Sequence, residues 1–221
     1  MTIQINYKQS ASTNTASNHI LFVDDNFNIK SIKKHISNYE FLYISDLLKN
    51  SDLKKDLLFF QINSKKTIFL LSIKKDLKVS DIEYLGAKFH NHINYKKKED
   101  YLVNTDTINS KLKDFVGYFL HGIKLKSYEF NIYKSKKDKK KISINVVGNK
   151  NRISAQIQLR FKALEEGTFF ARDLVSEPGN ILHPDEYAKR INELKKFGLK
   201  INIYDEKKLK KLGMNALLGV G

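Results

Sequence analysis

Histidines, lysines and acidic residues are the side chains in this sequence whose types could do chemistry, and few of them stand at spacings that favour a site. His90 and His92 form the one close pair of histidines. Residues two apart on a helix point in different directions, so this pair does not make a metal-binding motif. We interpret both as surface or partly buried residues of a helix.

His121 stands near the end of an apolar helical pattern. It could act as a base, but the sequence identifies no serine or cysteine as its partner nucleophile. The carboxyl end of a helix favours a histidine for electrostatic reasons alone, so we expect a structural role. The sequence also lacks His-Glu-x-x-His, a glycine-rich phosphate loop and Gly-x-Ser-x-Gly, the local motifs of several hydrolases and NTPases.

Six lysines gather in residues 134–141, directly after Tyr128, Phe130 and Tyr133. Aromatic rings beside lysines are typical of surfaces that bind single-stranded nucleic acid, so a basic nucleic-acid-binding module is an alternative function. The simpler interpretation is a solvated loop whose aromatic neighbours pack a helix-to-strand connection. The net charge of +16 adds little to the alternative, because the 40 basic residues include only four arginines, which phosphate sites usually recruit.

Length and composition set wider limits. A chain of 221 residues allows one complete domain and part of a second, and 41% hydrophobic residues are enough for a folded core. The absence of cysteine excludes disulfides, thiolate metal sites and cysteine nucleophiles. Residues 1–19 lack the apolar core of a secretory signal and are rich in Ser, Thr and Asn, which predicts a mobile leader. The apolar runs are also too short to span a membrane, so we expect a cytoplasmic protein.

The elements that must position these side chains are predicted from hydrophobic periodicity. Helices are predicted over 80–93, with Ser80 and Glu83 as a capping box, and from Asp106 or Thr107 to Gly122. Strands that alternate with such helices indicate an α/β fold with a mixed sheet, and residues 57–62 and 67–73 are close enough for an antiparallel hairpin whose faces are both covered. The predicted strands are residues 20–23, 57–62, 67–73, 101–103 and 142–147.

A second organisation begins after residue 150. A helix over 152–176 ends before Pro178, and a second helix runs from Pro184 to Gly198. Residues 199–203 and 214–220 are strand-like, and a short helix lies between them. This β-α-β pattern predicts an incomplete second α/β domain, because two strands and one short helix leave most of a sheet uncovered. We therefore divide the chain into domains at 1–150 and 151–221.

Residues 170–188 closely resemble the start of the catalytic domain of the leucyl aminopeptidases, the cytosol aminopeptidase family. Residues 204–206 and 212–221 extend the resemblance toward the family's first catalytic-domain strand, and residues 122–134 are similar to its pattern before a variable loop. The sequence departs from the family at Ser176, Gly179 and His183, where Asn, Ala or Pro, and Thr are usual. The resemblance is strong from about residue 117 and only architectural before it, where the family has a macro-like α/β domain.

The resemblance implies a function for the complete enzyme more than for this chain. The family resembles two-metal hydrolases, in which paired zinc or manganese ions ionise the water that attacks the amino-terminal peptide bond. The family's metal-binding and catalytic residues match positions beyond Gly221, so we assign no catalytic, cofactor-binding or metal-binding residue here. Glu165, Glu166 and Asp173 are interpreted as helix-surface charges.

The role predicted for the chain rests on the same resemblance. We expect the amino-terminal portion of a leucyl aminopeptidase, noncatalytic by itself, with a role in assembly or regulation. The family implies a homo-oligomer, a hexamer, or a separate catalytic segment as the partner. A third possibility from the macro-like architecture, an ADP-ribose pocket, is ranked last because no glycine-rich phosphate-binding loop is present.

Overall fold

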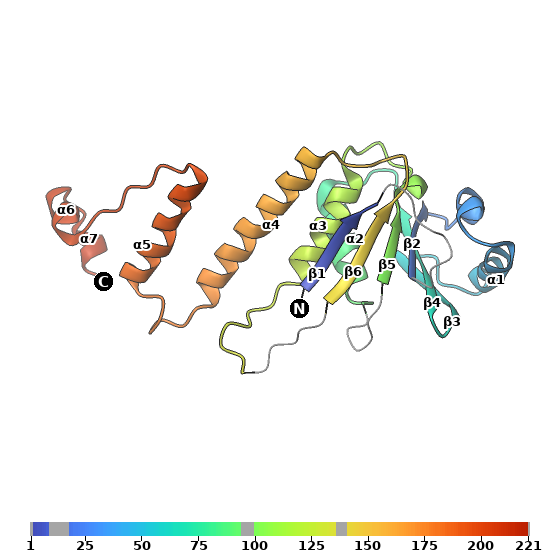
Figure 1. The fold of residues 1–221 in the computed structure, drawn as a ribbon, viewed down its shortest axis with the longest axis horizontal. Helices are drawn as coiled ribbons and strands as arrows, with labels where there is room; N and C mark the ends of the chain where they lie inside the picture. The colour runs from blue at the N-terminus through green and yellow to red at the C-terminus, as the bar shows by residue number, and fades with distance from the viewer. Residues whose placement is uncertain (1, 9–17, 94–99, 136–140, 221) are drawn as a thin grey trace. The chain divides into compact units, whose positions relative to one another are not determined.

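The computed structural model describes residues 2–8, 18–93, 100–135 and 141–220 (Figure 1). The chain divides into two compact units, Met1–Thr168 and Phe169–Gly221. The first unit contains a sheet with helices on its faces, and the second contains short helices joined by loops.

A six-stranded mixed sheet forms the centre of the first unit, with the strand order β1-β6-β5-β2-β4-β3 (Figure 1). All neighbouring strands are parallel except β3 and β4, which form the predicted antiparallel hairpin. The α/β class and the five predicted strands are confirmed. The six strands are β1 (Thr2–Tyr7), β2 (Asn18–Asp24), β3 (Leu57–Asn63), β4 (Lys66–Ile73), β5 (Asp100–Asn104) and β6 (Lys141–Val147).

The edge strand β1 shows that the prediction of a leader over residues 1–19 was wrong. Ile3 lies opposite Ile142 of β6 and is almost fully buried. Asn18 and His19, also assigned to the leader, begin β2 and are buried as well. The part of the predicted leader at 9–17 lies outside the described residues. β1 has a polar residue at every second position, so it lacks the continuous apolar run of the other strands. This alternation is nevertheless the pattern of a strand with one apolar face.

Helices α2 (Val79–His90) and α3 (Phe115–Lys126) pack on one face of the sheet (Figure 1). The apolar stripe predicted for α2 is buried in the core. Its predicted capping box is wrong, because the helix begins at Val79 and the carboxylate of Asp81 accepts a hydrogen bond from the Lys78 N–H at 2.8 Å. Glu83, the other half of the predicted box, faces α3 instead.

The start and end predicted for α3 are also wrong. Thr105–Thr107 form a short 3-10 helix, and α3 begins only at Phe115, after Asp114 in the left-handed region with φ 59°. Ile108 fits the helical period but lies in the intervening loop, where it is still buried. The helix continues past Gly122 to Lys126, because this glycine serves a helix contact and does not end the helix.

Two glycines let α2 and α3 approach closely. A Cβ atom on Gly86 would lie 2.0 Å from the carbonyl oxygen of Phe119, and one on Gly122 would lie 1.9 Å from that of Glu83. Each backbone thus occupies the space that a side chain of the other helix would need. The two helices are positioned by this reciprocal contact.

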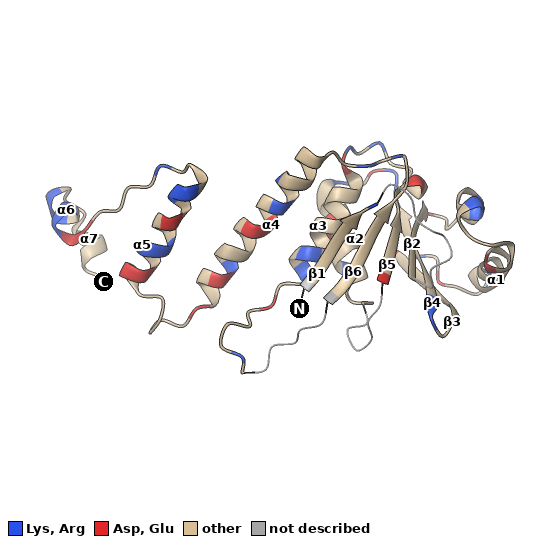
Figure 2. Ribbon diagram, viewed as in Figure 1, with Lys and Arg blue, Asp and Glu red and all other residues tan. Residues whose placement is uncertain are grey.

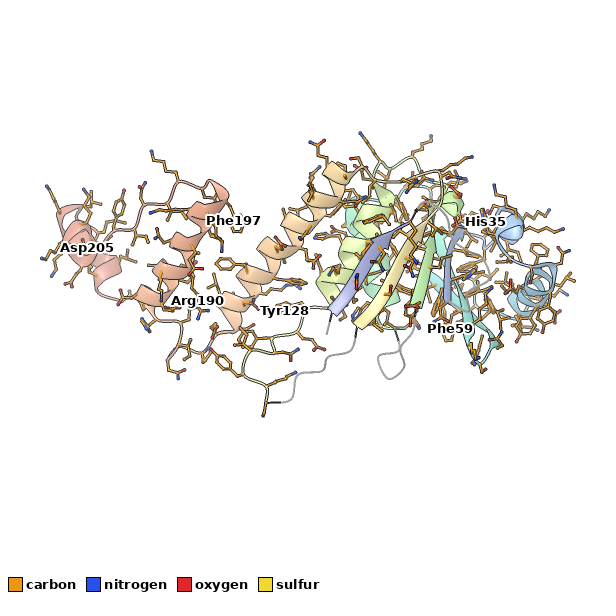
Figure 3. The ribbon with its side chains drawn as sticks, in the orientation of Figure 1. His35, Phe59, Tyr128, Arg190, Phe197 and Asp205 are labelled. Atoms are coloured by element: carbon orange, nitrogen blue, oxygen red, sulfur yellow. The ribbon has the colours of Figure 1, made fainter. Side chains whose placement is uncertain are left out.

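The opposite face of the sheet is covered over β2, β4 and β3 by a 3-10 helix, η1 (Ile29–His35), and by α1 (Asn38–Leu48). Ser37 and Glu40 form a capping box at the start of α1, and Glu40 also pairs with Lys66 of β4 at 2.7 Å. β4 is therefore buried on both faces as predicted, whereas the edge strand β3 leaves Phe59 54% exposed (Figure 3).

Helix α4 (Ala155–Ser176) runs from the first unit into the second, which continues with α5 (Pro184–Asn192), the 3-10 helix η3 (Glu193–Phe197), α6 (Glu206–Lys211) and α7 (Asn215–Leu218). The helix predicted from Pro184 to Gly198 is an α-helix only as far as Asn192, and η3 continues it to Gly198, which has φ 84°. Asp205 caps α6, as predicted. The strands predicted at 199–203 and 214–220 are wrong. Residues 199–203 are irregular, α7 occupies part of the second segment, and neither segment pairs with a strand among the described residues. A strand needs a neighbour to satisfy its backbone groups.

None of the helices in the described residues has the length and apolar character needed to cross a membrane.

Candidate functional site

The carboxyl ends of the parallel strands β2 and β5 mark the point in the sheet where ligands of α/β proteins usually bind. β2 connects onward to β3 and β4 on one side of it, and β5 connects onward to β6 on the other. Connections that diverge from adjacent strands leave a crevice at their carboxyl ends. Here the crevice is a cavity of about 750 Å³ whose lining includes Asp24, Asn28, Lys74, Thr107 and Lys111.

The backbone amides at this crevice are already used by the protein's own carboxylates. Asp24 Oδ1 accepts hydrogen bonds from the N–H groups of Asn26 and Asn28, at 3.2 and 2.8 Å. Free amides at the start of a helix are what a phosphate group would need. Because Asp24 occupies them and no glycine-rich loop surrounds them, the crevice offers no support for the ADP-ribose alternative.

Asp106, after β5, makes a similar internal contact. Its carboxylate accepts hydrogen bonds from the N–H groups of Asn149 and Lys150, at 2.7 and 2.6 Å. Burial by itself raises the pKa of Asp106, but these two amides, together with the nearby charges of His35 and Lys34, hold the pKa below its ordinary value. The aspartate is a structural anion that ties the chain after β6 to the chain after β5.

The histidines singled out from the sequence have structural surroundings. His92 packs its ring against Phe59 and Phe69, with ring centroids 5.2 and 6.3 Å apart, and burial lowers the pKa of both His90 and His92. His121 lies in the middle of α3, and its Nδ1 is 2.8 Å from Glu83 Oε1 of α2. The sequence could not reveal this pair, since its members are 38 residues apart. The structural roles expected for the three histidines stay predictions.

The lysine-rich segment 134–141 is only partly described. Residues 136–140 lie outside the described residues, and Lys134 precedes them in an irregular segment. Phe130 and Tyr133 pack against each other with ring centroids 5.8 Å apart, an arrangement in which the rings contact one another. Figure 2 shows basic and acidic residues distributed along the helices of both units. Among the described residues, no specific contact therefore favours the nucleic-acid alternative.

The segment that resembles the aminopeptidases forms a fixed connection between α4 and α5. The carbonyl oxygen of Pro178 accepts hydrogen bonds from the N–H groups of Ile181 and Leu182, both at 2.9 Å, which closes the turn after α4. His183 is the extended N-cap residue of α5, and Pro184 is the first residue of that helix. Proline suits this position because its fixed φ is helical and no hydrogen bond is lost.

Arg190, which is labelled in Figure 3, joins the two ends of this connection. Its guanidinium donates from Nη1 to Glu177 at 2.8 Å and from Nε to Glu186 at 2.9 Å, and the Glu177 side chain is only 2% exposed. Bonds from Arg190 are the largest cause that lowers the pKa of Glu186. The spacing of Glu186 and Arg190 predicts an ion pair on one helix face, but Glu177, across the turn, could not be foreseen.

The described residues do not fit a two-metal centre. They contain no group of three or more His, Asp or Glu side chains that could hold a metal ion. Glu165 pairs with Lys124 at 2.9 Å, and Glu166 lies 3.7 Å from Lys162. Glu165 is thus engaged by a lysine of α3 and Glu166 by a lysine of α4, and no step of a metal-dependent reaction can be derived from these residues.

Comparison with known proteins finds a family match for the connection between α4 and α5 and for the residues after it. Residues 169–221 match the catalytic-domain model of the cytosol aminopeptidase family. A probable cytosol aminopeptidase from Agrobacterium fabrum is 32% identical over 167 residues, which cover 72% of this chain and 34% of the relative. The chain belongs to the cytosol aminopeptidase family. The chain spans about a third of the length of that relative.

Solved structures agree in fold. A tomato leucine aminopeptidase mutant superimposes with a TM-score of 0.66 at 16% identity, covering 96% of this chain and 46% of its own. The bottromycin maturation enzyme BotP in complex with Mn gives a TM-score of 0.63 at 15% identity, covering 90% of this chain and 40% of its own. The sheet, its helices and the following helices of this chain are thus a portion of the leucine aminopeptidase fold.

Proposed function

We propose that this chain is the amino-terminal portion of a leucyl aminopeptidase that releases amino-terminal residues from peptides. Residues 1–150 would form its macro-like domain, and residues 151–221 its linker helix and the first part of its catalytic domain. The observation that carries the proposal is the family match over residues 169–221, which coincides with the connection held by Arg190.

The role of this portion in the complete enzyme is assembly or regulation rather than chemistry. Paired zinc or manganese ions would supply an ionised water and polarise the peptide carbonyl. BotP, which shares this fold, has a solved structure in complex with Mn. The described residues of this chain offer no donor set for such ions, so the ligands would come from other residues of the enzyme. The chain by itself would be noncatalytic.

The exposed apolar side chains of the second unit support the proposal that another part of the enzyme packs against it. Phe197 is 68% exposed, and the neighbouring apolar side chains of Leu199, Ile203 and Leu212 are each about half exposed. Large exposed apolar side chains at this density are typical of surfaces that another part of a protein covers. In the complete enzyme we assign that cover to the rest of the catalytic domain, and we expect a homo-oligomer in the cytoplasm.

A direct test is to assay the purified chain with leucine p-nitroanilide and added manganese or zinc, for which we expect no turnover. The same chain is then fused in frame to the part of the Agrobacterium fabrum relative that lies beyond its matched region. Metal-dependent turnover by the fusion, and none by the chain, is the expected result. Metal-dependent turnover by residues 1–221 alone would overturn the noncatalytic assignment.

A matched pair of variants in the fusion tests the role of the connection. Arg190→Met removes the bonds to Glu177 and Glu186, whereas Arg160→Met removes an exposed arginine of α4 that makes no such bridge. We expect the first variant to lower turnover and the second to leave it unchanged, because only Arg190 fixes the approach to the catalytic domain. Equal turnover in both variants would show that the bonds of Arg190 to Glu177 and Glu186 are not needed for activity of the fusion.

A further inference from the structure

β3 forms one edge of the six-stranded sheet, and its outer side pairs with no other strand among the described residues (Figure 1). The Ser72 N–H donates to the Asp56 carbonyl at 2.9 Å, which fixes the residues of β3 that hydrogen-bond to β4. Bonded and non-bonded residues alternate in an antiparallel pair, so the backbone groups of Leu57, Phe59 and Gln61 point away from β4. These three residues therefore present their N–H and C=O groups at the open edge.

A groove of about 480 Å³ lies beside this edge, between the start of β3 and the end of α2. Leu57 and Phe59 line it from β3, and Asn91 and His92 line it from the residues that follow α2. The rings of Phe59 and His92 have centroids 5.2 Å apart, and more than half of the Phe59 side chain is exposed (Figure 3). An apolar surface thus stands directly beside backbone groups that have no strand partner.

The three lysines that line the groove differ in whether they are already paired. Lys88 pairs with Asp56, so its ammonium group is satisfied within the protein. Lys54 and Lys55 are exposed, and neither forms an ion pair with another residue that the structure describes. Asp52 accepts a hydrogen bond from the backbone N–H of Lys54 at 3.1 Å, but it does not line the groove. Two positive charges at the start of β3 are therefore available to a ligand.

These charges decide between the two kinds of strand that the open edge could bind. A second copy of β3, paired antiparallel about Phe59, would bring Lys54 and Lys55 of each copy close to the exposed Lys65 of the other. Like charges placed opposite one another destabilise a strand pair, and lysines at an edge are a common protection against self-association. A peptide with acidic side chains at that end meets the same lysines with the opposite charge.

We propose that the open edge of β3 binds an acidic peptide segment, which adds to the sheet as a further strand antiparallel to β3. The peptide backbone bonds to Leu57, Phe59 and Gln61, as in other cases of strand addition to a sheet edge. One apolar side chain of the peptide lies in the groove beside Phe59, and the carboxylates that follow it face Lys54 and Lys55. The site does not depend on the proposed peptidase function, because all of its residues belong to the first unit.

Isothermal titration calorimetry of the purified chain with the peptide acetyl-Thr-Val-Phe-Val-Thr-Ser-Glu-Glu-amide tests the proposal. In the proposed register its phenylalanine lies opposite Phe59, and its glutamates lie opposite Lys54 and Lys55. We expect saturable binding that weakens at least about tenfold when both glutamates are replaced by lysine, because attraction then becomes repulsion. Equal affinity of the acidic and basic peptides, or no binding at millimolar peptide, overturns the proposal.

Methylated peptides test whether the backbone pairs with β3. N-methylation of the phenylalanine and the second threonine removes N–H groups that face β3, and should weaken binding at least about tenfold. N-methylation of the two valines removes N–H groups that point away from β3, and should leave the affinity unchanged. Equal affinity of the two methylated peptides overturns strand addition.

Matched lysine variants of the chain test the location of the site. Lys54→Gln together with Lys55→Gln should weaken binding of the acidic peptide about fivefold, since exposed ion pairs each contribute modestly. Lys33→Gln together with Lys34→Gln changes two exposed lysines of η1 that do not line the groove, and should leave the affinity unchanged. Equal affinity of the two double variants overturns the location.

Phe59→Ser tests the apolar contact and also the choice of partner. It should weaken binding of the peptide at least about tenfold, whereas Phe197→Ser, which removes an exposed phenylalanine of the second unit, should not. If Phe59→Ser fails to fold, the lysine variants and the methylated peptides still decide, because they leave the core intact. Sedimentation velocity of the original chain is the last check, since a dimer that Phe59→Ser dissociates would assign the edge to a second copy and overturn the proposal.

Discussion

The two units of this chain are built on different principles. Within the described residues, the buried apolar side chains belong to the first unit with the single exception of Leu174. The second unit is held instead by caps, turns and the ion pairs of Arg190, while many of its large apolar side chains, such as Phe197, remain exposed. The first unit can thus be stable through its own core, whereas the second depends on local interactions.

The glycines sharpen the same contrast. Gly86, Gly117 and Gly122 of the first unit have neighbours within about 2 Å of where a Cβ would stand, so their small size is required by packing. Gly179, Gly198 and Gly213 of the second unit have nothing within 4 Å. At Gly198 and Gly213, with φ 84° and 71°, backbone conformation alone requires glycine. These three glycines of the first unit thus serve tertiary packing, whereas Gly198 and Gly213 serve local turns.

Hydrogen exchange should show the largest difference between the units. We expect the amides of β2, β4 and β5 to exchange at least about a thousandfold more slowly than those of α5 and α6, because core strands open only by global unfolding. Exchange of the intact chain, followed by mass spectrometry of peptides, measures this ratio. Similar protection in the two units would mean that the second is covered in solution, for example by another copy of the chain.

Gly122→Ala should strongly destabilise the first unit. The added Cβ would meet the Glu83 carbonyl at 1.9 Å, so α2 and α3 must move apart, at a cost of about 3 kcal/mol or more. Urea denaturation monitored by circular dichroism gives the loss in the free energy of unfolding. A loss below about 1 kcal/mol would contradict the close approach of the two helices.

His19 should make the first unit sensitive to acid. Burial, with a smaller contribution from Lys66, lowers the pKa of this histidine from its ordinary value of 6.5 to about 4. The folded state therefore favours the neutral ring, and its stabilising contribution is complete above pH 6.5 and is lost as the pH falls toward 4. The full loss is about 3 kcal/mol, at 1.36 kcal/mol per pKa unit.

The control for this effect is His19→Gln, which cannot titrate. Between pH 7 and 4.5, the free energy of unfolding of the original chain should fall more steeply than that of the variant. The carboxylates with lowered pKa values, such as Glu40, lose their contribution only below about 4.5, so they affect both proteins little in this range. Parallel pH profiles of the two proteins would show that His19 is accessible to water in the folded state.

The parts of the fold that the sequence predicted are those whose side chains report burial directly. β2 and β4 are apolar nearly throughout because both their faces are covered, and the buried stripe of α2 follows the helical period. β1 was missed because Gln4 and Asn6 interrupt its apolar residues. Their side chains face a polar part of the sheet, where Asn6 donates to Ser143 at 2.9 Å.

The failures share a physical cause, which is dependence on a distant partner. Residues 199–203 alternate like a strand, but pairing decides whether alternation becomes a strand. Ile108 and Leu112 fit a helix by spacing, yet Asn151 donates to the Ile108 carbonyl at 2.8 Å and helps hold this segment as a loop. The family resemblance is confirmed by the match over residues 169–221, while the bonds of Arg190 to Glu177 and of His121 to Glu83 required the structure.

Gly167→Ala should have the smallest effect, and in the opposite direction. Gly167 lies inside α4, where a Cβ would meet nothing within 4 Å. Alanine loses less conformational entropy than glycine on forming a helix, so the substitution should stabilise α4 by up to about 1 kcal/mol. Thermal unfolding of this variant beside Gly122→Ala compares one added methyl group on an open helix surface with the same group in a closed helix contact. A loss of stability on Gly167→Ala would place another surface against α4 in solution, and the contrast between the closed contact of Gly122 and the open helix surface at Gly167 would then fail.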